Sequence, residues 1–352
     1  MQKSFPKISV CIPVFSTEPY LARCLRSVFT QSFSDFEIVI VNDGSFGTDE
    51  NGWNCKKIVK SFQKEAKKLR KELKLPAVSF DYTEHRTNLG LLEARRTAVE
   101  NAHGEYICIL DSDDELLPEA LSNMYNAAVG SNADIVQGRA EVFCSGNSEQ
   151  DKKRAEKMLE KVNLLFAGEL SGESVFNGFL LNKNHTAFLW GKLIRRTVYL
   201  EAFSHIPFTQ CVFAEDVLQY FFISYAAKKY VGIENPVCRY TVDTGISSNR
   251  KIDDLKRWEK VCSTASVFTI IFDEVKKFEP PLNLELMEAI RNQSRSYLAN
   301  NLKQLREAVV SELQKEAREM LCEYWGETFV EKVEKLQKES AATSQQQNKN
   351  PQ

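Results

Sequence analysis

The first 110 residues alternate between short apolar segments and longer amphipathic ones, and this alternation constrains the fold more than any other feature of the sequence. Apolar runs of strand length are followed by runs whose apolar residues recur every three or four positions, as on one face of a helix. The predicted strands are Ile8–Phe15, Phe36–Val41, Ala77–Tyr82 and Tyr106–Leu110. The predicted helices cover residues 20–29, 54–74 and 91–102. Such an order predicts an α/β fold with a mainly parallel sheet and helices on both faces.

Polar residues follow each predicted strand. They form the segments Ser16–Glu18, Asn42–Ser45, His85–Asn88 and Asp111–Asp114. Open α/β sheets bind ligands at the carboxyl ends of their strands. We therefore expect these four segments to converge on one polar crevice of the nucleotide-binding type.

The pattern changes after about residue 250 to long helical periodicity, which predicts a C-terminal helical region. Its predicted helices cover residues 253–279, 282–304, 306–323 and 326–339, and Pro280 and Pro281 separate the first two. The last residues, 340–352, are polar and rich in Gln and Asn, which predicts a disordered tail. The predicted domains are therefore residues 1–250 and 251–339, followed by that tail.

Composition excludes several classes of protein. The 46 Lys and Arg nearly balance 48 Asp and Glu, so no global charge attracts nucleic acid, and we predict no nucleic-acid partner. The nine cysteines show no Cys-x-x-Cys spacing, which favours free thiols in a reducing cytoplasm. Neither a Gly-x-Gly-x-x-Gly motif nor a Walker lysine loop occurs, which argues against dinucleotide oxidoreductases and P-loop enzymes. No apolar segment predicts a signal peptide or a membrane span.

The acidic cluster Asp111-Ser112-Asp113-Asp114 at the end of an apolar strand is the strongest chemical signature. Alternate residues of an extended segment point to the same side, so Asp111 and Asp113 share one side. Carboxylate oxygens there suit Mg²⁺ or Mn²⁺ bound together with substrate phosphates. The alternative is an acidic loop in which Asp114 makes a turn or caps the helix predicted near Pro118.

Two further carboxylate motifs have both a structural and a functional interpretation. Asp43 lies in Asn-Asp-Gly-Ser, which is good turn chemistry, but a second acidic strand end nearby favours a carboxylate that binds a nucleotide base. Glu215 and Asp216 precede an apolar helix and could cap it. Asp216 is also a candidate general base for deprotonating an acceptor hydroxyl.

Three other segments are candidates for substrate contacts. Trp190 and Lys192 lie in Trp-Gly-Lys-Leu, which suits either a substrate contact or ordinary core beside a surface lysine. Arg250 ends a glycine and serine loop that could meet a diphosphate, although a solvated loop fits equally. The helix at 54–74 has nine Lys or Arg against two Glu, so peripheral membrane contact competes with a solvated outer helix.

Taken together, these residues resemble the inverting glycosyltransferases of family 2, which have the GT-A fold. The matching segments are Ile8–Phe15, Gln31–Ser45, Asn88–Gly90, Ala94–Arg95, Gly104–Asp114, Trp190–Leu193 and Glu215–Asp216. The resemblance covers about residues 6–250 and departs at Phe15-Ser16 and at Arg96, where the family usually has Tyr-Asn and Asn.

The resemblance implies a role for each matching position. Residues implied in binding the nucleotide sugar are Pro13, Val14, Glu18, Asp43, Asn88, Arg95, Asp111 and Ser112. Asp113 would bind the metal, Mn²⁺ or Mg²⁺, and Asp216 would be the catalytic base. Candidate donor or acceptor contacts are Trp190, Lys192, Glu215 and Arg250.

The implied reaction moves a sugar from a nucleotide-diphosphate donor, a UDP-sugar above all, to a hydroxyl of a glycan or lipid-linked glycan. The predicted location is the cytoplasm, and peripheral attachment to the cytoplasmic face of the membrane is the alternative. A retaining transferase, a sugar-1-phosphate nucleotidyltransferase and a non-catalytic nucleotide- or glycan-binding module are the alternatives. The nucleotidyltransferases usually have a glycine-rich loop near the N-terminus, which is missing here.

Overall fold

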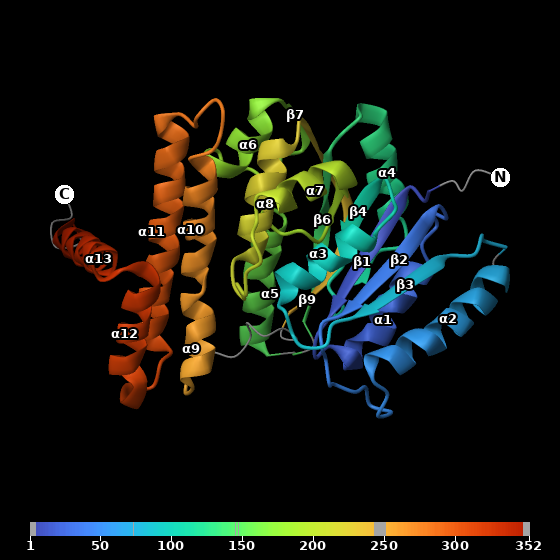
Figure 1. Cartoon of the computed structure of the whole chain (residues 1–352), viewed down its shortest axis with the longest axis horizontal. Coiled ribbons are helices and arrows are strands. Elements are labelled where there is room, and N and C mark those ends of the chain that lie inside the picture. The colour runs from blue at the N-terminus through green and yellow to red at the C-terminus, as the bar shows by residue number, and fades with distance from the viewer. Residues whose placement is uncertain (1–4, 73, 145, 147, 243–250, 348–352) are drawn as a thin grey trace. The chain divides into compact units, whose positions relative to one another are not determined.

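The computed structural model describes residues 5–72, 74–144, 146, 148–242 and 251–347 (Figure 1). The chain divides into two compact units. The first contains residues 1–210 and 219–248, and the second contains residues 211–218 and 249–352. The first unit holds a sheet with its helices, and the second is helical.

Nine strands of the described residues form one sheet in the order β3-β2-β1-β4-β8-β6-β9-β5, with β7 paired to β9. The strands are β1 (Ile8–Val14), β2 (Phe36–Asn42), β3 (Ser79–Glu84), β4 (Tyr106–Ile109), β5 (Glu115–Leu116), β6 (Ile135–Cys144), β7 (Gly168–Ser171), β8 (Lys192–Arg195) and β9 (Lys229–Val242). Strands β1 to β4 are parallel, as predicted. The later half is mixed, because β8 runs antiparallel to both β4 and β6.

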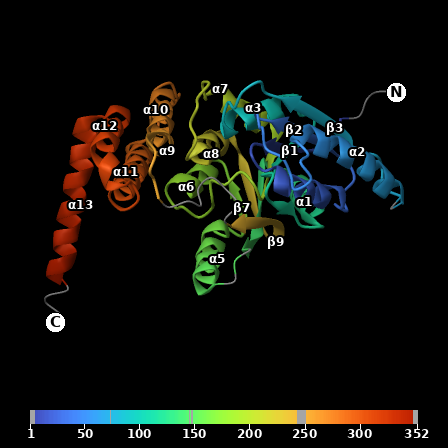
Figure 2. The ribbon, with the colours of Figure 1, turned by 90° about the horizontal axis from the view of Figure 1, so that it is seen from below.

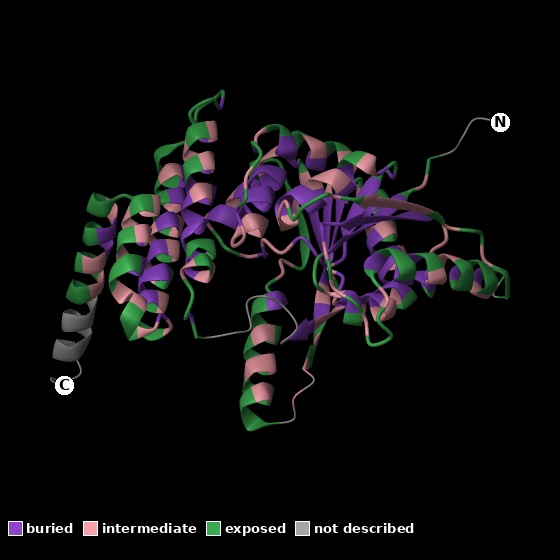
Figure 3. Cartoon of the chain, turned by 60° about the horizontal axis from the view of Figure 1, so that its bottom comes forward, coloured by how far each residue is buried: buried purple, intermediate pink, exposed green. Residues whose placement is uncertain are grey.

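Helices cover both faces of the sheet, as predicted. In the first unit they are α1 (Glu18–Phe29), α2 (Cys55–Glu72), α3 (Leu91–Asn101), α4 (Ala120–Ser131), α5 (Glu149–Val162), α6 (Glu173–Leu180), α7 (Arg196–Ser204) and most of α8 (Glu215–Ala226). Alternate residues of β1, Ile8 to Val14, form one core with α1, α2 and α4. Helix α3 packs on the other side of β1 and β2 (Figure 2). Every residue of β1 and β2 is therefore buried (Figure 3).

The second unit contains α9 (Leu255–Cys262), α10 (Thr264–Val275), α11 (Leu284–Glu307), a short 3-10 helix (Ser311–Leu313), α12 (Gln314–Trp325) and α13 (Glu327–Gln347). The predicted break at Pro280 and Pro281 is confirmed. The predicted helix 253–279 is instead two helices that divide at Ser263. There the Asn301 side-chain amide donates to the Val261 carbonyl at 2.8 Å, and the Ser263 hydroxyl donates to the Lys260 carbonyl.

Helix α13 continues to Gln347 and so includes residues 340–347 of the segment for which the sequence predicts a disordered tail. That tail stays a prediction. Residues 348–352 lie outside the described part. No described helix is long and apolar enough to cross a lipid bilayer.

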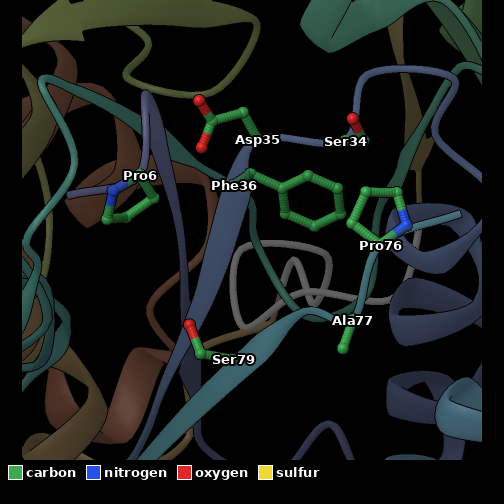
Figure 4. Close-up of a pocket in the computed structure, with 7 residues that line it drawn as sticks. All are labelled: Pro6, Ser34, Asp35, Phe36, Pro76, Ala77 and Ser79. Carbon is green, nitrogen blue, oxygen red and sulfur yellow. The ribbon is translucent and has the colours of Figure 1, made fainter. Parts of the chain in front are cut away.

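A depression of about 310 Å³ lies at the amino ends of β1, β2 and β3. Its lining residues are Pro6, Ser34, Asp35, Phe36, Pro76, Ala77 and Ser79 (Figure 4). Phe36 and Ser79 are the first residues of their strands, so this depression is at the sheet edge opposite to the predicted polar crevice.

Candidate functional site

The register of the parallel strands brings the four polar segments to one edge of the sheet. Val14 at the end of β1 pairs with Asn42 at the end of β2, and Asn42 pairs with Glu84 at the end of β3. Cys11 pairs with Ile109, the last residue of β4. The predicted convergence of the carboxyl ends is therefore confirmed.

Hydrogen bonds join the segments across this edge. The hydroxyls of Thr17, after β1, and Ser112, after β4, lie 2.6 Å apart. The Ser16 amide donates to the Ser45 hydroxyl at 2.9 Å, which links the ends of β1 and β2. Ser112 is buried, so the polar edge is held by contacts between its own segments.

Asp43 is a buried carboxylate, only 2% exposed, that joins β2 to the start of α3. Its two oxygens accept the backbone amides of Leu89 and Gly90, each at 2.9 Å. One of them also lies 2.7 Å from Nδ1 of His85. The Asn88 amide donates to the Asp43 backbone carbonyl at 3.4 Å. Asp43 therefore fixes the loop that leads into α3, whatever else it binds.

The other predicted nucleotide contacts near β1 are largely enclosed. Pro13 and Val14 are buried strand residues, whereas Phe15 is 38% exposed. Glu18 is completely buried; one of its oxygens accepts the Ser45 hydroxyl at 2.6 Å, and the other has no hydrogen-bond partner among the described residues. In this structure Glu18 supports the loop after β2, and a role in the base or ribose pocket stays a prediction.

Arg95 brings α3 to the acidic turn. Its guanidinium is almost completely buried and donates to Oδ1 of Asp111 at 3.1 Å. Asp111 itself keeps 23% of its side-chain surface exposed. Arg95 therefore holds one oxygen of the Asp111 carboxylate and leaves acceptor capacity open on its solvent side.

Arg23 on α1 holds the other side of the turn and was missed in the sequence, where it is one basic residue among many. Its guanidinium donates to the Asp113 carbonyl at 2.5 Å and to the Thr241 hydroxyl at 2.9 Å. It also lies 3.4 Å from a Glu115 carboxylate oxygen. Arg23 therefore ties the acidic turn to β9 and β5.

Asp114 is the structural member of the cluster. It is 2% exposed, its carboxylate accepts the Thr241 amide at 2.7 Å, and its own amide closes the turn onto the Asp111 carbonyl at 3.0 Å. Burial, followed by the charges of Asp113 and Asp111, raises the pKa of the Asp114 carboxyl well above its usual value. The turn interpretation of Asp114 holds, but it caps no helix, because α4 begins at Ala120.

Comparison with known proteins decides the family. A family model described as glycosyl transferase family 2 matches residues 9–200, which is more than half of the chain. This chain belongs to glycosyl transferase family 2.

Individual relatives are more distant. The chain is 35% identical over 138 residues to glycosyltransferase GlyA of Streptococcus pneumoniae, a match that covers 38% of this chain and 16% of that protein. It is 31% identical over 193 residues to a GalNAc(5)-diNAcBac-PP-undecaprenol beta-1,3-glucosyltransferase of Campylobacter jejuni, covering 53% and 57%. Among solved structures, S. aureus TarS 1-349 in complex with UDP-GlcNAc has a TM-score of 0.53 at 17% identity, covering 94% and 92%. The matched segment is 16% of GlyA and 57% of the Campylobacter protein, so the chain spans only part of these curated relatives. TarS shows the shared fold alone.

The acidic turn of this family 2 protein has the donor chemistry for a divalent metal. Asp111 and Asp113 are both partly exposed, and both present hard oxygen atoms. No group of three or more His, Cys, Asp or Glu side chains in the described residues is arranged to enclose a metal. Two carboxylates fit Mg²⁺ or Mn²⁺, which commonly takes its remaining ligands from water and substrate phosphates.

Trp190 lies beside the site but is enclosed by other aromatic rings. It forms a bridge with Ile109, next to the acidic turn. Its ring stacks between Phe188 and Tyr240, with centroids 4.9 and 5.0 Å away, and it is only 6% exposed. Trp190 therefore supports the edge near Asp111, and a direct substrate contact stays a prediction.

Lys192 is a fully buried cation, so the interpretation as a surface lysine is wrong. Its ammonium donates to the Phe188 carbonyl at 2.5 Å and to the Thr186 hydroxyl at 3.0 Å, and it lies over the Tyr220 ring. Lys192 is the first residue of the buried strand β8, and its side chain points to one face of the sheet. The Phe188 carbonyl and the Thr186 hydroxyl provide the hydrogen bonds that a buried ammonium group needs. The lysine fixes the segment before Trp190.

His185 provides a pH test of this buried region. Burial, and then the charge of Lys192, lower the pKa of His185 to about 3. Because the unfolded chain takes up the proton near pH 6.5 and the folded chain does not, the free energy of unfolding should fall by up to about 1.4 kcal/mol per pH unit below that value. The variant His185→Phe keeps the ring packing on Tyr230 but has no imidazole to protonate. Measured by urea unfolding, its free energy of unfolding should fall less steeply with decreasing pH than that of the wild type, by the same amount per pH unit. Equal slopes for both proteins would exclude this contribution.

Glu215 and Asp216 belong to the second unit, where they begin α8. Burial, followed by the charges of Asp216 and Glu215, raises the pKa of Tyr297 to about 12. The Leu218 amide donates to the Ala214 carbonyl at 3.1 Å, which closes the first turn of the helix. Their placement next to the acidic turn stays a prediction, and Arg250 lies outside the described residues.

The buried position of Asp43 leads to a stability prediction. Asp43→Asn replaces one acceptor oxygen with an NH₂ group that would face the amide of Leu89 or Gly90, so the free energy of unfolding should fall by about 2 kcal/mol. Urea unfolding measures this, with Asp81→Asn on the edge strand β3 as the control. A change of less than about 0.5 kcal/mol would show that the clamp contributes little.

Proposed function

We propose that this family 2 protein is an inverting, metal-dependent glycosyltransferase that moves a sugar from a UDP-sugar to a hydroxyl of a glycan or lipid-linked glycan. The observation that carries the proposal is the convergence of Asp43, the buried Arg95 and the acidic turn Asp111–Asp114 at one sheet edge. The relatives' names as glycosyltransferases support it. TarS, which shares the fold, was crystallised in complex with UDP-GlcNAc.

The residues of the first unit would bind the donor. Asp43 would accept a hydrogen bond from the base, and Asp111 would contact the ribose or the sugar. Arg95 is buried against Asp111, so it orients this carboxylate and adds positive charge near the diphosphate. The remaining nucleotide contacts that we propose are Pro13, Val14, Glu18, Asn88 and Ser112.

Asp113, helped by Asp111, would hold Mn²⁺ or Mg²⁺. When bound, such an ion offsets the negative charge that develops on the leaving diphosphate. Arg23 holds the Asp113 backbone and so keeps the carboxylate pair in one orientation.

Asp216 would be the general base. As the acceptor oxygen attacks the anomeric carbon, its proton passes to the Asp216 carboxylate, and the bond between that carbon and the diphosphate oxygen breaks. The nucleoside diphosphate leaves from the opposite face, so the anomeric configuration inverts. Glu215, Trp190, Lys192 and Arg250 stay candidate donor or acceptor contacts.

The domain and location assignments are part of the same proposal. Residues 1–250 would form the catalytic domain and residues 251–339 a helical region. The Campylobacter relative is named for an undecaprenol-linked acceptor, so we propose a cytoplasmic protein that reaches acceptors at the cytoplasmic membrane face.

A screen of UDP-, GDP- and dTDP-sugars with Mn²⁺ and Mg²⁺, scored by released nucleoside diphosphate, tests the proposal. Release with a UDP-sugar and an inverted product would support it. A retained anomer would replace the inverting mechanism. Release of pyrophosphate from a nucleoside triphosphate and a sugar-1-phosphate would identify a nucleotidyltransferase. Nucleotide binding without turnover of any sugar would favour a non-catalytic module.

A further inference from the structure

Helix α2 presents a row of lysines on its outer face. Its 18 residues include seven lysines, all exposed. Four of them, Lys60, Lys64, Lys67 and Lys71, follow the spacing of one helical stripe and span about 16 Å. None of these four ammonium groups is within 4.0 Å of a carboxylate in the part of the chain that the structure describes.

The opposite face of α2 is fully used in the fold. Ile58, Val59, Phe62 and Ala66 are buried in the core with β1, β2 and α1. The apolar stripe that could insert into a membrane is therefore committed to the sheet. Any contact that α2 makes with an outside partner must depend on the charge of its lysines.

The lysine row does not help the helix to form. Lys60 and Lys64, and likewise Lys67 and Lys71, are like charges at i and i+4, which disfavours a helix. The first turn carries Lys56 and Lys57 and no acidic residue, opposite to the preference set by the helix dipole. Helix α5 shows the usual balance, with Glu149 and Asp151 in its first turn. Lys71 lies in the last turn, where the helix dipole favours a cation, but neither the dipole nor a described ion pair explains Lys60, Lys64 and Lys67.

We propose that the outer face of α2 docks the protein onto an anionic lipid bilayer. Lysine ammonium groups act as point charges, and a row of them suits a fluid array of headgroups better than a partner that must be read by paired hydrogen bonds. Arg70 is the one residue of α2 whose guanidinium could make paired hydrogen bonds to a partner. It is buried and donates to the Pro76 carbonyl instead. This inference goes beyond the transfer reaction.

The position of α2 in the chain fits a docked enzyme. Its N-terminal end follows the connection from the carboxyl end of β2, the edge that carries Asp43. In that connection the Phe46 side chain is 93% exposed. Exposed aromatic rings and lysines each favour the bilayer interface. Docking through this surface would keep the candidate donor site close to lipid-linked acceptors.

Vesicle sedimentation tests the proposal without donor or acceptor. The full chain should bind vesicles that contain phosphatidylglycerol and should not bind pure phosphatidylcholine vesicles. Raising the salt should release it, since these charges are exposed. Replacing Lys60, Lys64, Lys67 and Lys71 by glutamine should weaken binding up to about 1,000-fold, because each lysine contributes separately to the attraction.

A matched variant with glutamine at Lys152, Lys153, Lys157 and Lys161 of α5 removes the same charge and should bind within about threefold of the wild type. The α2 variant should melt at or above the wild-type temperature, because glutamine removes repulsion within the helix. Equal loss in both variants, wild-type binding by the α2 variant, or binding to heparin but to no vesicle would overturn the proposal. Since no sugar transfer is measured, failure here leaves the proposed reaction to its own test.

Discussion

Asp216→Asn is expected to lower kcat by about a thousandfold while leaving donor binding nearly unchanged. Asparagine keeps the shape of the side chain but cannot accept the acceptor's proton at neutral pH. The measurement is steady-state release of nucleoside diphosphate from the best donor, paired with calorimetric titration of the same nucleotide.

Glu285→Gln is the control, because Glu285 is an exposed carboxylate in the first turn of another helix of the same unit, α11. Both variants should unfold at the same urea concentration. If Glu285→Gln lost as much activity as Asp216→Asn, the loss would reflect a general effect of removing a carboxylate from a helix start. Turnover like the wild type in Asp216→Asn would exclude Asp216 as the base.

Asp113→Ala is expected to remove metal-dependent donor binding, with at least about a hundredfold lower affinity for the donor in Mn²⁺ or Mg²⁺. The variant loses one of only two partly exposed carboxylates in the turn, whereas Arg23 still holds the backbone carbonyl at this position. Donor titrations with metal and with a chelator measure the effect. In the chelator, the wild type and the variant should bind equally weakly.

Glu119→Gln controls for a general loss of negative charge near the turn, since Glu119 is an exposed residue just before α4. It should keep the metal dependence of the wild type. The role of Asp113 would be contradicted if Asp113→Ala bound the donor as tightly as the wild type in metal.

Much of the fold was predictable because its signals are local. Strands β1 to β4 and helices α1 to α3 follow the predicted positions within a few residues, since both the apolar runs and the helical periodicity are strong. Strands β5, β7 and β8 have two to four residues, too short for alternation to stand out. These three short strands were therefore missed, and with them the antiparallel pairing of β8 with β4 and β6.

The candidate site divides in the same way. The sequence was enough to predict that Asp43 and Asp111–Asp114 lie at one edge, because parallel strands end together. It could not show that Arg95 donates to Asp111 or that Arg23 holds Asp113, because the partners are 16 and 90 residues apart along the chain.

The sequence by itself determined the α/β class, the polar edge and the acidic turn, since each depends on residue type, short spacing and strand direction. Only the tertiary structure decided what individual side chains do there. It made Asp43 a clamp on α3, buried Lys192 in the sheet and left the lysines of α2 in solvent. The physical reason is that burial and partners are set by elements distant in the chain, whose packing no local pattern encodes.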